Sequence, residues 1–293
     1  MAMGESLIVR GSKNRTRTLT SQLRRVGCAF LVVIAAAADS TRAAQAPSEF
    51  DDTSLPQLLK VAREELQAAR LSKKEIQLRL TVVENVATVK AYFPHADGGR
   101  PEMRNPKYWV ENAEGSYIPR GKPSDSIKDL WQTTSGIRCR KLSSLVMLKS
   151  LIDVADLQQL AKLDEMLSSK VIPNDLPDQG IGTFFERERP KRGQVFQNDE
   201  FLPGDNVWFE NPYFAKLSQK QQSRYLGQEG HHVFYIGAGQ VMDMYGRRPV
   251  PIEDFRRTFL KWQSVTIVAE DEHLEPKSAD FQIKGVRRVI LKD

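Results

Sequence analysis

The sequence predicts an α+β fold in which helices come first and a small antiparallel sheet follows. Apolar residues recur at helical spacing over residues 54–90, and a nearly continuous apolar run over 143–152 is typical of a buried helix. From residue 202 onward the pattern changes to short strands separated by glycine-containing turns. Helices followed by a separate run of strands are the arrangement of an α+β domain.

The first 46 residues have the pattern of a secretory signal peptide. Arg24-Arg25 precede a short apolar run, and the small residues Ala44-Gln45-Ala46 follow it. Cleavage is expected after Ala46, after Ala43 or near Ala38, with an uncleaved anchor as the alternative. The apolar run is too short for a confident bilayer-spanning helix. We therefore expect no stable membrane span in the mature chain, which would be exported to the periplasm, the cell envelope or the medium.

The net charge does not indicate nucleic-acid binding. The whole chain has a formal net charge of +6, but its first 46 residues contain seven of the 43 basic residues and two of the 37 acidic ones. The rest holds 36 basic and 35 acidic residues and is almost neutral. We therefore expect no nucleic-acid partner.

The chain beyond the leader is expected to form one compact unit, with an N-terminal helical segment over 47–105 and the catalytic domain over 106–293. Two apolar stripes are separated by a break near Ser72. Residues 95–123 are rich in glycine and proline and are predicted to be loop, followed by a short helix over 124–133.

The predicted elements around the buried helix place one cysteine at its start. Cys139 falls at the N-terminal edge of the helix over 143–152, and a second helix is predicted over 155–168. The elements predicted after these helices are strands over 207–209, 231–236 and 240–245, a helix over 251–262, and closing strands over 264–268 and 286–291.

Cys139 is the one cysteine that remains after removal of the leader, since the other, Cys28, lies within it. Exported proteins usually pair their cysteines. A lone cysteine is therefore either a reactive thiol or an inert buried one. A helix N-terminus favours the thiolate, and a neighbouring imidazole can accept the proton. This pattern favours a thiol nucleophile paired with a histidine.

Only two of the four histidines lie where a strand would present them to this thiol. His95 and His273 fall in polar loops, whereas His231 and His232 open a predicted strand. Successive strand residues point to opposite faces, so only one of the pair can face the cysteine. Asp243, on the next predicted strand, is placed to orient that imidazole. A metal site needs three or four ligands, and no second cysteine or spaced histidine supplies them, so we expect no metal. We expect no cofactor either.

Several segments resemble the bacterial spore-coat protein-glutamine gamma-glutamyltransferases, over roughly residues 50–265. The matching segments occur in the family's order: Tyr108-Trp109, Pro123 to Leu130, Gly136-Ile137-Arg138-Cys139 with Ser143 to Asp153, and Gly204 to Pro212. The resemblance implies that Cys139 is the nucleophile of an acyltransferase. Its implied substrates are the glutamine and lysine side chains of proteins.

The sequence departs from that family at positions that matter for the chemistry. The family has a glutamate before its nucleophile, where this chain has Arg138. The family's catalytic glutamate position holds His231, and its downstream histidine falls near Met244. The departures raise the alternative of a non-catalytic scaffold with the same fold.

A second set of residues is similar to the NlpC-type cell-wall endopeptidases. It comprises Pro203-Gly204-Asp205 with Val207 and Phe209, then His231, Tyr235-Ile236-Gly237 and Asp243. Both resemblances imply one papain-like fold, with a nucleophile at the start of a buried helix packed on an antiparallel sheet. In this register His231 is the base, Asp243 orients it and His232 is the alternate base. The second resemblance implies a hydrolase acting on peptidoglycan peptides as the alternative activity.

Overall fold

The computed structural model describes residues 54–92, 105–111, 117–168, 185–188, 196, 200–224, 229–246, 248–259 and 282–289. The chain divides into two units, 1–45 and 46–293, and every described residue belongs to the second. The predicted signal peptide, the predicted strand over 264–268, His95 and His273 lie outside the described residues. In the part of the chain that is described, no helix has the length and apolarity needed to cross a membrane.

Helices dominate the first half of the chain, as the periodicity predicted. The helices are α2 (Leu55–Ala68), α3 (Lys73–Thr88), α4 (Pro123–Asp129), α5 (Cys139–Val154), α6 (Leu157–Ser168), the 3₁₀ turn η2 (Phe214–Lys216) and α7 (Gln219–Arg224). A further helical segment covers residues 252–259. The predicted break at Ser72 is an N-cap, because the Ser72 side chain accepts from the Glu75 N–H and the Glu75 side chain accepts from the Ser72 N–H.

The second half of the chain builds a six-stranded sheet in which all neighbours are antiparallel, in the order β5-β10-β6-β7-β8-β9. Its strands are β5 (Phe185–Glu188), β6 (Asn206–Glu210), β7 (Gly230–Gly237), β8 (Gln240–Met242), β9 (Pro249–Pro251) and β10 (Ile283–Val289). Two small pairs lie apart from it: β1 (Ala91–Tyr92) with β4 (Ser135–Gly136), and β2 (Trp109–Glu111) with β3 (Tyr117–Pro119). β2 and β3 fall within residues 95–123, which were predicted to be loop, and β1 and β4 lie outside that stretch.

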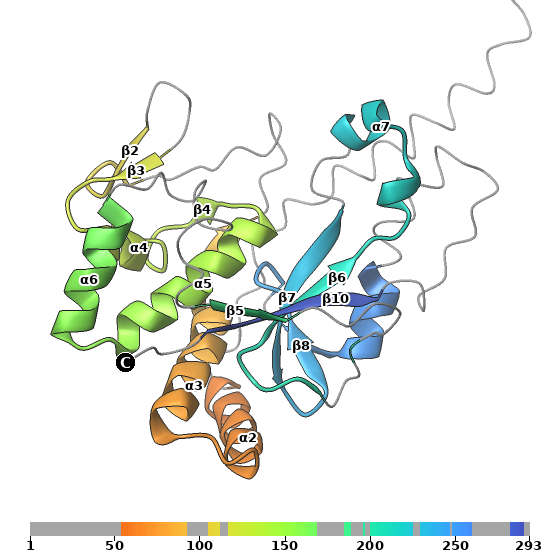
Figure 1. Cartoon of the computed structure of the whole chain (residues 1–293), viewed down its shortest axis with the longest axis horizontal. Helices are drawn as coiled ribbons and strands as arrows, with labels where there is room; N and C mark the ends of the chain where they lie inside the picture. Colours follow the sequence, from red (N-terminus) through yellow and green to blue (C-terminus); the bar gives the residue numbers. More distant parts are fainter. Residues whose placement is uncertain are drawn as a thin grey trace, which may run out of the picture. The chain divides into compact units, whose positions relative to one another are not determined.

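The sheet is buried on both faces by two separate apolar cores. Alternate residues of β7 divide between them: Phe234 and Ile236 belong to the core formed with α2, α3 and α5, whereas Val233 and Tyr235 pack with the segment 252–259. Figure 1 shows α5 beside β7, with α3 and α2 continuing the helical layer. The predicted α+β class is confirmed, and Cys139 is the first residue of α5.

The hairpin that carries the predicted site residues differs from its prediction at one end. Its turn is as predicted, with positive φ at Gly237 (104°) and Gly239 (69°), a conformation that glycine adopts without strain. The second strand was predicted over 240–245, but β8 ends at Met242. Asp243 therefore lies in a turn just beyond the strand, where its Oδ2 accepts from the Gly246 N–H at 3.3 Å.

A buried ion cluster joins the helical layer to the sheet. Asp205, whose side chain has no exposed surface, accepts from Arg79 of α3 at 2.8 Å and from Arg288 of β10 at 3.2 Å. Its second oxygen also accepts from the Leu202 N–H at 3.0 Å. The neighbouring Gly204 has φ +90°, and a Cβ there would come within 3.0 Å of the Arg79 carbonyl oxygen. The Gly204-Asp205 motif therefore holds the two layers together.

Asp205→Ala is expected to lower the free energy of unfolding by about 3–5 kcal/mol, because it leaves two partly buried guanidinium groups without their carboxylate. Asp254→Ala is the matched control, since the Asp254 side chain is 50% exposed and its ion pair with Arg257 lies at the surface. We expect that control to cost at most about 1 kcal/mol. Urea denaturation measures both, and equal costs would contradict the structural role of Asp205.

Candidate active site

The site is built around the first turn of α5. Arg138 is extended (φ −70°, ψ 150°), so the chain enters the helix at Cys139, and the first intrahelical bond runs from the Leu142 N–H to the Arg138 carbonyl at 2.8 Å. The first backbone N–H groups of a helix have no partner within it and point along its axis. Cys139 is buried, with 6% of its surface exposed. Its sulfur therefore lies where positive helix potential favours an anion.

The His231 imidazole is held between a carboxylate and this thiol. Its Nε2 lies 2.9 Å from Asp243 Oδ1, and it also makes a side-chain hydrogen bond with Cys139. Because Asp243 occupies Nε2, the remaining ring nitrogen, Nδ1, is the one left for the sulfur. The structure thus brings together the three residues predicted as nucleophile, base and orienter. Their catalytic roles remain a prediction.

The charges of this trio favour a protonated imidazole. Burial opposes that charge, but the negative charges of Asp243 and Cys139, together with hydrogen bonds to both, outweigh burial and raise the pKa of His231 to about 10. The arrangement therefore favours a charged imidazolium between the carboxylate and the sulfur. An imidazolium beside a thiol nucleophile is placed to carry a proton to or from the reacting groups.

Aromatic rings surround the imidazole. The ring centroids of Phe255 and Phe259, on the segment 252–259, each lie 5.8 Å from that of His231, and the Tyr245 centroid lies 6.3 Å away. Phe255 and Phe259 are themselves buried, at 4% and 1% exposure. The base is therefore shielded from bulk water.

His232, the predicted alternate base, has different neighbours. Its Nδ1 lies 2.9 Å from Asn206 Oδ1 of β6, and its ring lies 4.4 Å, centroid to centroid, from that of Trp208. Gly230 permits this packing, because a Cβ there would approach the Trp208 ring to 2.4 Å. The geometry therefore favours His231 over His232 as the partner of Cys139.

Tyr245 is a site residue that the sequence did not identify. Its hydroxyl donates to the Ile137 carbonyl at 2.5 Å, which ties the turn after β8 to the chain entering α5. Burial and the negative charges of Cys139 and Asp243 hold the pKa of this phenol well above 10, against an opposing effect of Arg138. The hydroxyl is therefore a neutral donor. The sequence pattern predicts residue 245 to be the end of a strand and gives no signal for this contact.

Asp243→Asn is expected to lower the pKa of His231 from about 10, because it removes the larger of the two charges that raise it. NMR titration of labelled histidine measures the change, with His231→Gln to assign the signal. An unchanged midpoint would contradict the arrangement.

The raised pKa of His231 makes the stability of the fold depend on pH. The folded pKa lies above the ordinary histidine value of 6.5, so the stabilisation from charged His231 is complete below pH 6.5 and is lost as the pH rises to about 10. The stability difference between wild type and Asp243→Asn should therefore shrink across that window.

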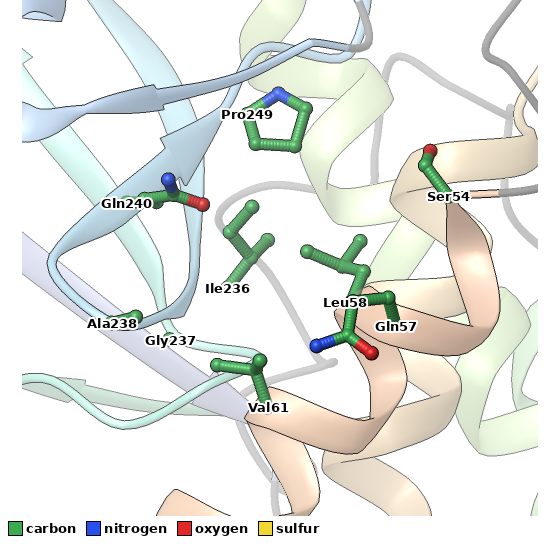
Figure 2. Close-up of a pocket in the computed structure, with 9 residues that line it drawn as sticks. All are labelled: Ser54, Gln57, Leu58, Val61, Ile236, Gly237, Ala238, Gln240 and Pro249. Carbon is green, nitrogen blue, oxygen red and sulfur yellow. The ribbon is translucent and has the colours of Figure 1, made fainter.

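A hollow of about 290 Å³ lies elsewhere, between α2 and the β7–β8 hairpin (Figure 2). Val61 and Leu58 of α2 face Ile236 and Pro249 across it, and no titratable side chain lines it. Within the described residues, no group of three or more His, Cys, Asp or Glu side chains has the arrangement of a metal site. The trio around Cys139 is therefore the arrangement best suited to chemistry in the described part of the chain.

A helix-borne cysteine beside a strand-borne histidine and its aspartate partner defines a papain-like cysteine enzyme. A family model, the protein-glutamine gamma-glutamyltransferase family, matches residues 53–243. The chain belongs to this family of acyltransferases.

Two known proteins extend the comparison. A protein-glutamine gamma-glutamyltransferase of Halalkalibacterium halodurans is 25% identical over 150 residues, which cover 48% of this chain and 46% of that protein. The chain thus matches about half the length of this curated relative. The solved transglutaminase of Geobacillus stearothermophilus, without its C-terminal extension, has a TM-score of 0.50 and 16% identity over 75% of this chain and 95% of that one. This likeness shows the fold.

Proposed function

We propose that the protein is a protein-glutamine gamma-glutamyltransferase, which joins a glutamine side chain of one protein to a lysine side chain of another. Family membership over residues 53–243 supports the reaction class. The single observation that carries the mechanism is the hydrogen-bonded chain from Cys139 through His231 to Asp243. It joins a nucleophile, a proton carrier and a group that orients the proton carrier.

Acylation begins with the thiolate of Cys139. Its sulfur attacks the carboxamide carbon of a glutamine side chain and forms a tetrahedral oxyanion. In this mechanism the backbone N–H groups at the start of α5, including that of Cys139, stabilise the oxyanion. The C–N bond then breaks, the imidazolium of His231 gives its proton to the departing nitrogen, and ammonia leaves a thioester on Cys139.

Deacylation uses the same groups in reverse. The neutral imidazole accepts a proton from the lysine amine as its nitrogen attacks the thioester carbonyl. The C–S bond breaks, an isopeptide bond remains, and the thiolate–imidazolium pair is restored. Asp243 keeps the Nε2–H of His231 directed away from the reacting sulfur through both steps.

The comparisons favour the transferase over the cell-wall peptidase and the non-catalytic scaffold. The rings of Phe255, Phe259 and Tyr245 pack around His231, which is 9% exposed, and limit its contact with bulk water, a setting that disfavours hydrolysis of the thioester. We propose that the substrates are glutamine and lysine side chains of proteins. Peptidoglycan peptides are the alternative substrate.

Incorporation of a labelled primary amine into a glutamine-containing protein tests the proposal. Casein incubated with purified mature protein and the labelled amine should gain label and release ammonia. No label with a free, alkylatable Cys139 would contradict a transferase, and release of new amino termini from purified peptidoglycan would favour the hydrolase instead.

The proposal includes export, based on the basic and apolar pattern of residues 1–46. Expression of the full chain in a bacterial host, followed by mass measurement of the extracytoplasmic protein, tests it. A species shortened by about 38 to 46 residues is expected. Full-length protein confined to the cytoplasm would contradict export.

A further inference from the structure

Arg287 of β10 connects the helix that carries the nucleophile to the sheet that carries the base. Its Nη1 donates to Ser144 Oγ of α5 at 2.9 Å, and its Nη2 donates to Ser143 Oγ. On the other side, its Nε and Nη2 donate to Asn206 Oδ1 of β6 at 3.0 and 2.7 Å. One guanidinium thus spans two layers of the fold.

The helical end of this bridge lies one turn from the nucleophile. Ser143 follows Cys139 by four residues, which places the two on the same face of α5. Both serine hydroxyls donate to the Arg140 carbonyl, at 2.9 and 3.1 Å, and so present lone pairs to Arg287. Because a helix turn is rigid, holding Ser143 also holds Cys139.

The sheet end of the bridge lies beside the strand that carries the base. Asn206 Nδ2 donates to the Val233 carbonyl of β7 at 3.0 Å, two residues from His231. Its Oδ1, which accepts from Arg287, also lies 2.9 Å from His232 Nδ1. Arg287 Nη2 is 3.5 Å from the same His232 nitrogen. The asparagine therefore ties the guanidinium to β7.

We propose that Arg287 is a positioning residue that sets the start of α5 against β7, so that the Cys139 thiol meets His231. The residue lies beyond the region 53–243 that the family model matches. Its planar fork of donors suits this task, because it reaches Ser143, Ser144 and Asn206 at once. The proposal deepens the proposed function and rests on Cys139 and His231 as its reacting groups.

Alkylation of Cys139 by iodoacetamide as a function of pH tests the proposal without requiring transferase activity. Among the described residues, the charges of Asp243 and Cys139 act on His231, and those of Cys139, Asp243 and Arg138 act on the nearby Tyr245. Wild type should react rapidly at pH 6.5, because the neighbouring His231 can accept the thiol proton. Arg287→Gln should react at least about tenfold more slowly at pH 6.5, because its thiol no longer meets this imidazole.

Arg288→Gln is the matched control, since it removes the next guanidinium of the same strand. Arg288 contacts Asp205 and contributes to the stability of the fold. We expect both variants to lose thermal stability, but only Arg287→Gln to lose fast alkylation at pH 6.5. Equal profiles for the two variants would overturn the proposal.

Two further variants keep the test decisive if Arg287→Gln fails to fold. Ser143→Ala combined with Ser144→Ala removes the acceptors on α5 and should slow alkylation in the same pH range. Arg287→Lys keeps the charge without the fork and should also be slow. A wild-type profile in either variant would overturn the positioning role. Fast alkylation of wild type without amine incorporation would instead count against the proposed function alone.

Discussion

Cys139→Ala is expected to abolish amine incorporation, with a loss of roughly 10³–10⁶ in kcat. The thiolate forms the only covalent bond to the glutamine carbonyl in the proposed mechanism, and the remaining groups then have no nucleophile to assist. Incorporation of a labelled amine into casein measures the loss. Cys139→Ser keeps nearly the same volume at a position with 6% exposure. It should therefore fold normally, and the higher pKa of a hydroxyl should leave it almost inactive as well.

A Cys139→Ala variant that retained amine incorporation would show that another residue attacks the glutamine. The helix-start geometry would then serve packing alone. A thermal unfolding midpoint close to that of wild type is the necessary control, because the thiol also belongs to the core formed with α3 and α5.

His231→Gln is expected to lower kcat by about 10²–10⁴, the range for loss of a positioned general acid and base. The variant keeps a polar side chain beside Asp243 but cannot carry the proton from the thiol to the departing ammonia. His232→Gln is the matched control on the adjacent residue. Since His232 contacts Asn206 and Trp208, its replacement should retain most of the wild-type kcat.

The two histidine variants together decide which imidazole is the base. A larger loss in His232→Gln than in His231→Gln would contradict the assignment made from the hydrogen bonds. The KM of both should change little, because neither side chain is expected to bind the remote parts of the protein substrate.

The local patterns in the sequence predicted those features that depend on neighbouring residues. The break at Ser72 followed from a change of apolar stripe, and the β7–β8 turn followed from two glycines that adopt positive φ. The starting residue of α5 was harder to predict, because the helix is apolar nearly all round and has no apolar stripe to mark its ends. Its placement at Cys139 depends on the extended backbone of Arg138.

The features that were missed depend on contacts between distant parts of the chain. β10 lies between β5 and β6, so its place in the sheet is set by strands from two other regions. Arg287 acquires its partners on α5 and β6 only through that placement. Asp243 lies in a turn because it accepts from the Gly246 N–H, which ends the strand three residues early.

Intact mass measurement of the acyl-enzyme tests most directly that Cys139, paired with His231, attacks a glutamine carboxamide. Wild-type protein would be mixed with a glutamine-containing peptide in the absence of amine and quenched rapidly in acid. The predicted result is an adduct on Cys139 equal to the peptide minus ammonia, which accumulates in wild type and disappears when a lysine analogue is added. A free Cys139 thiol with no adduct and no ammonia released would contradict it.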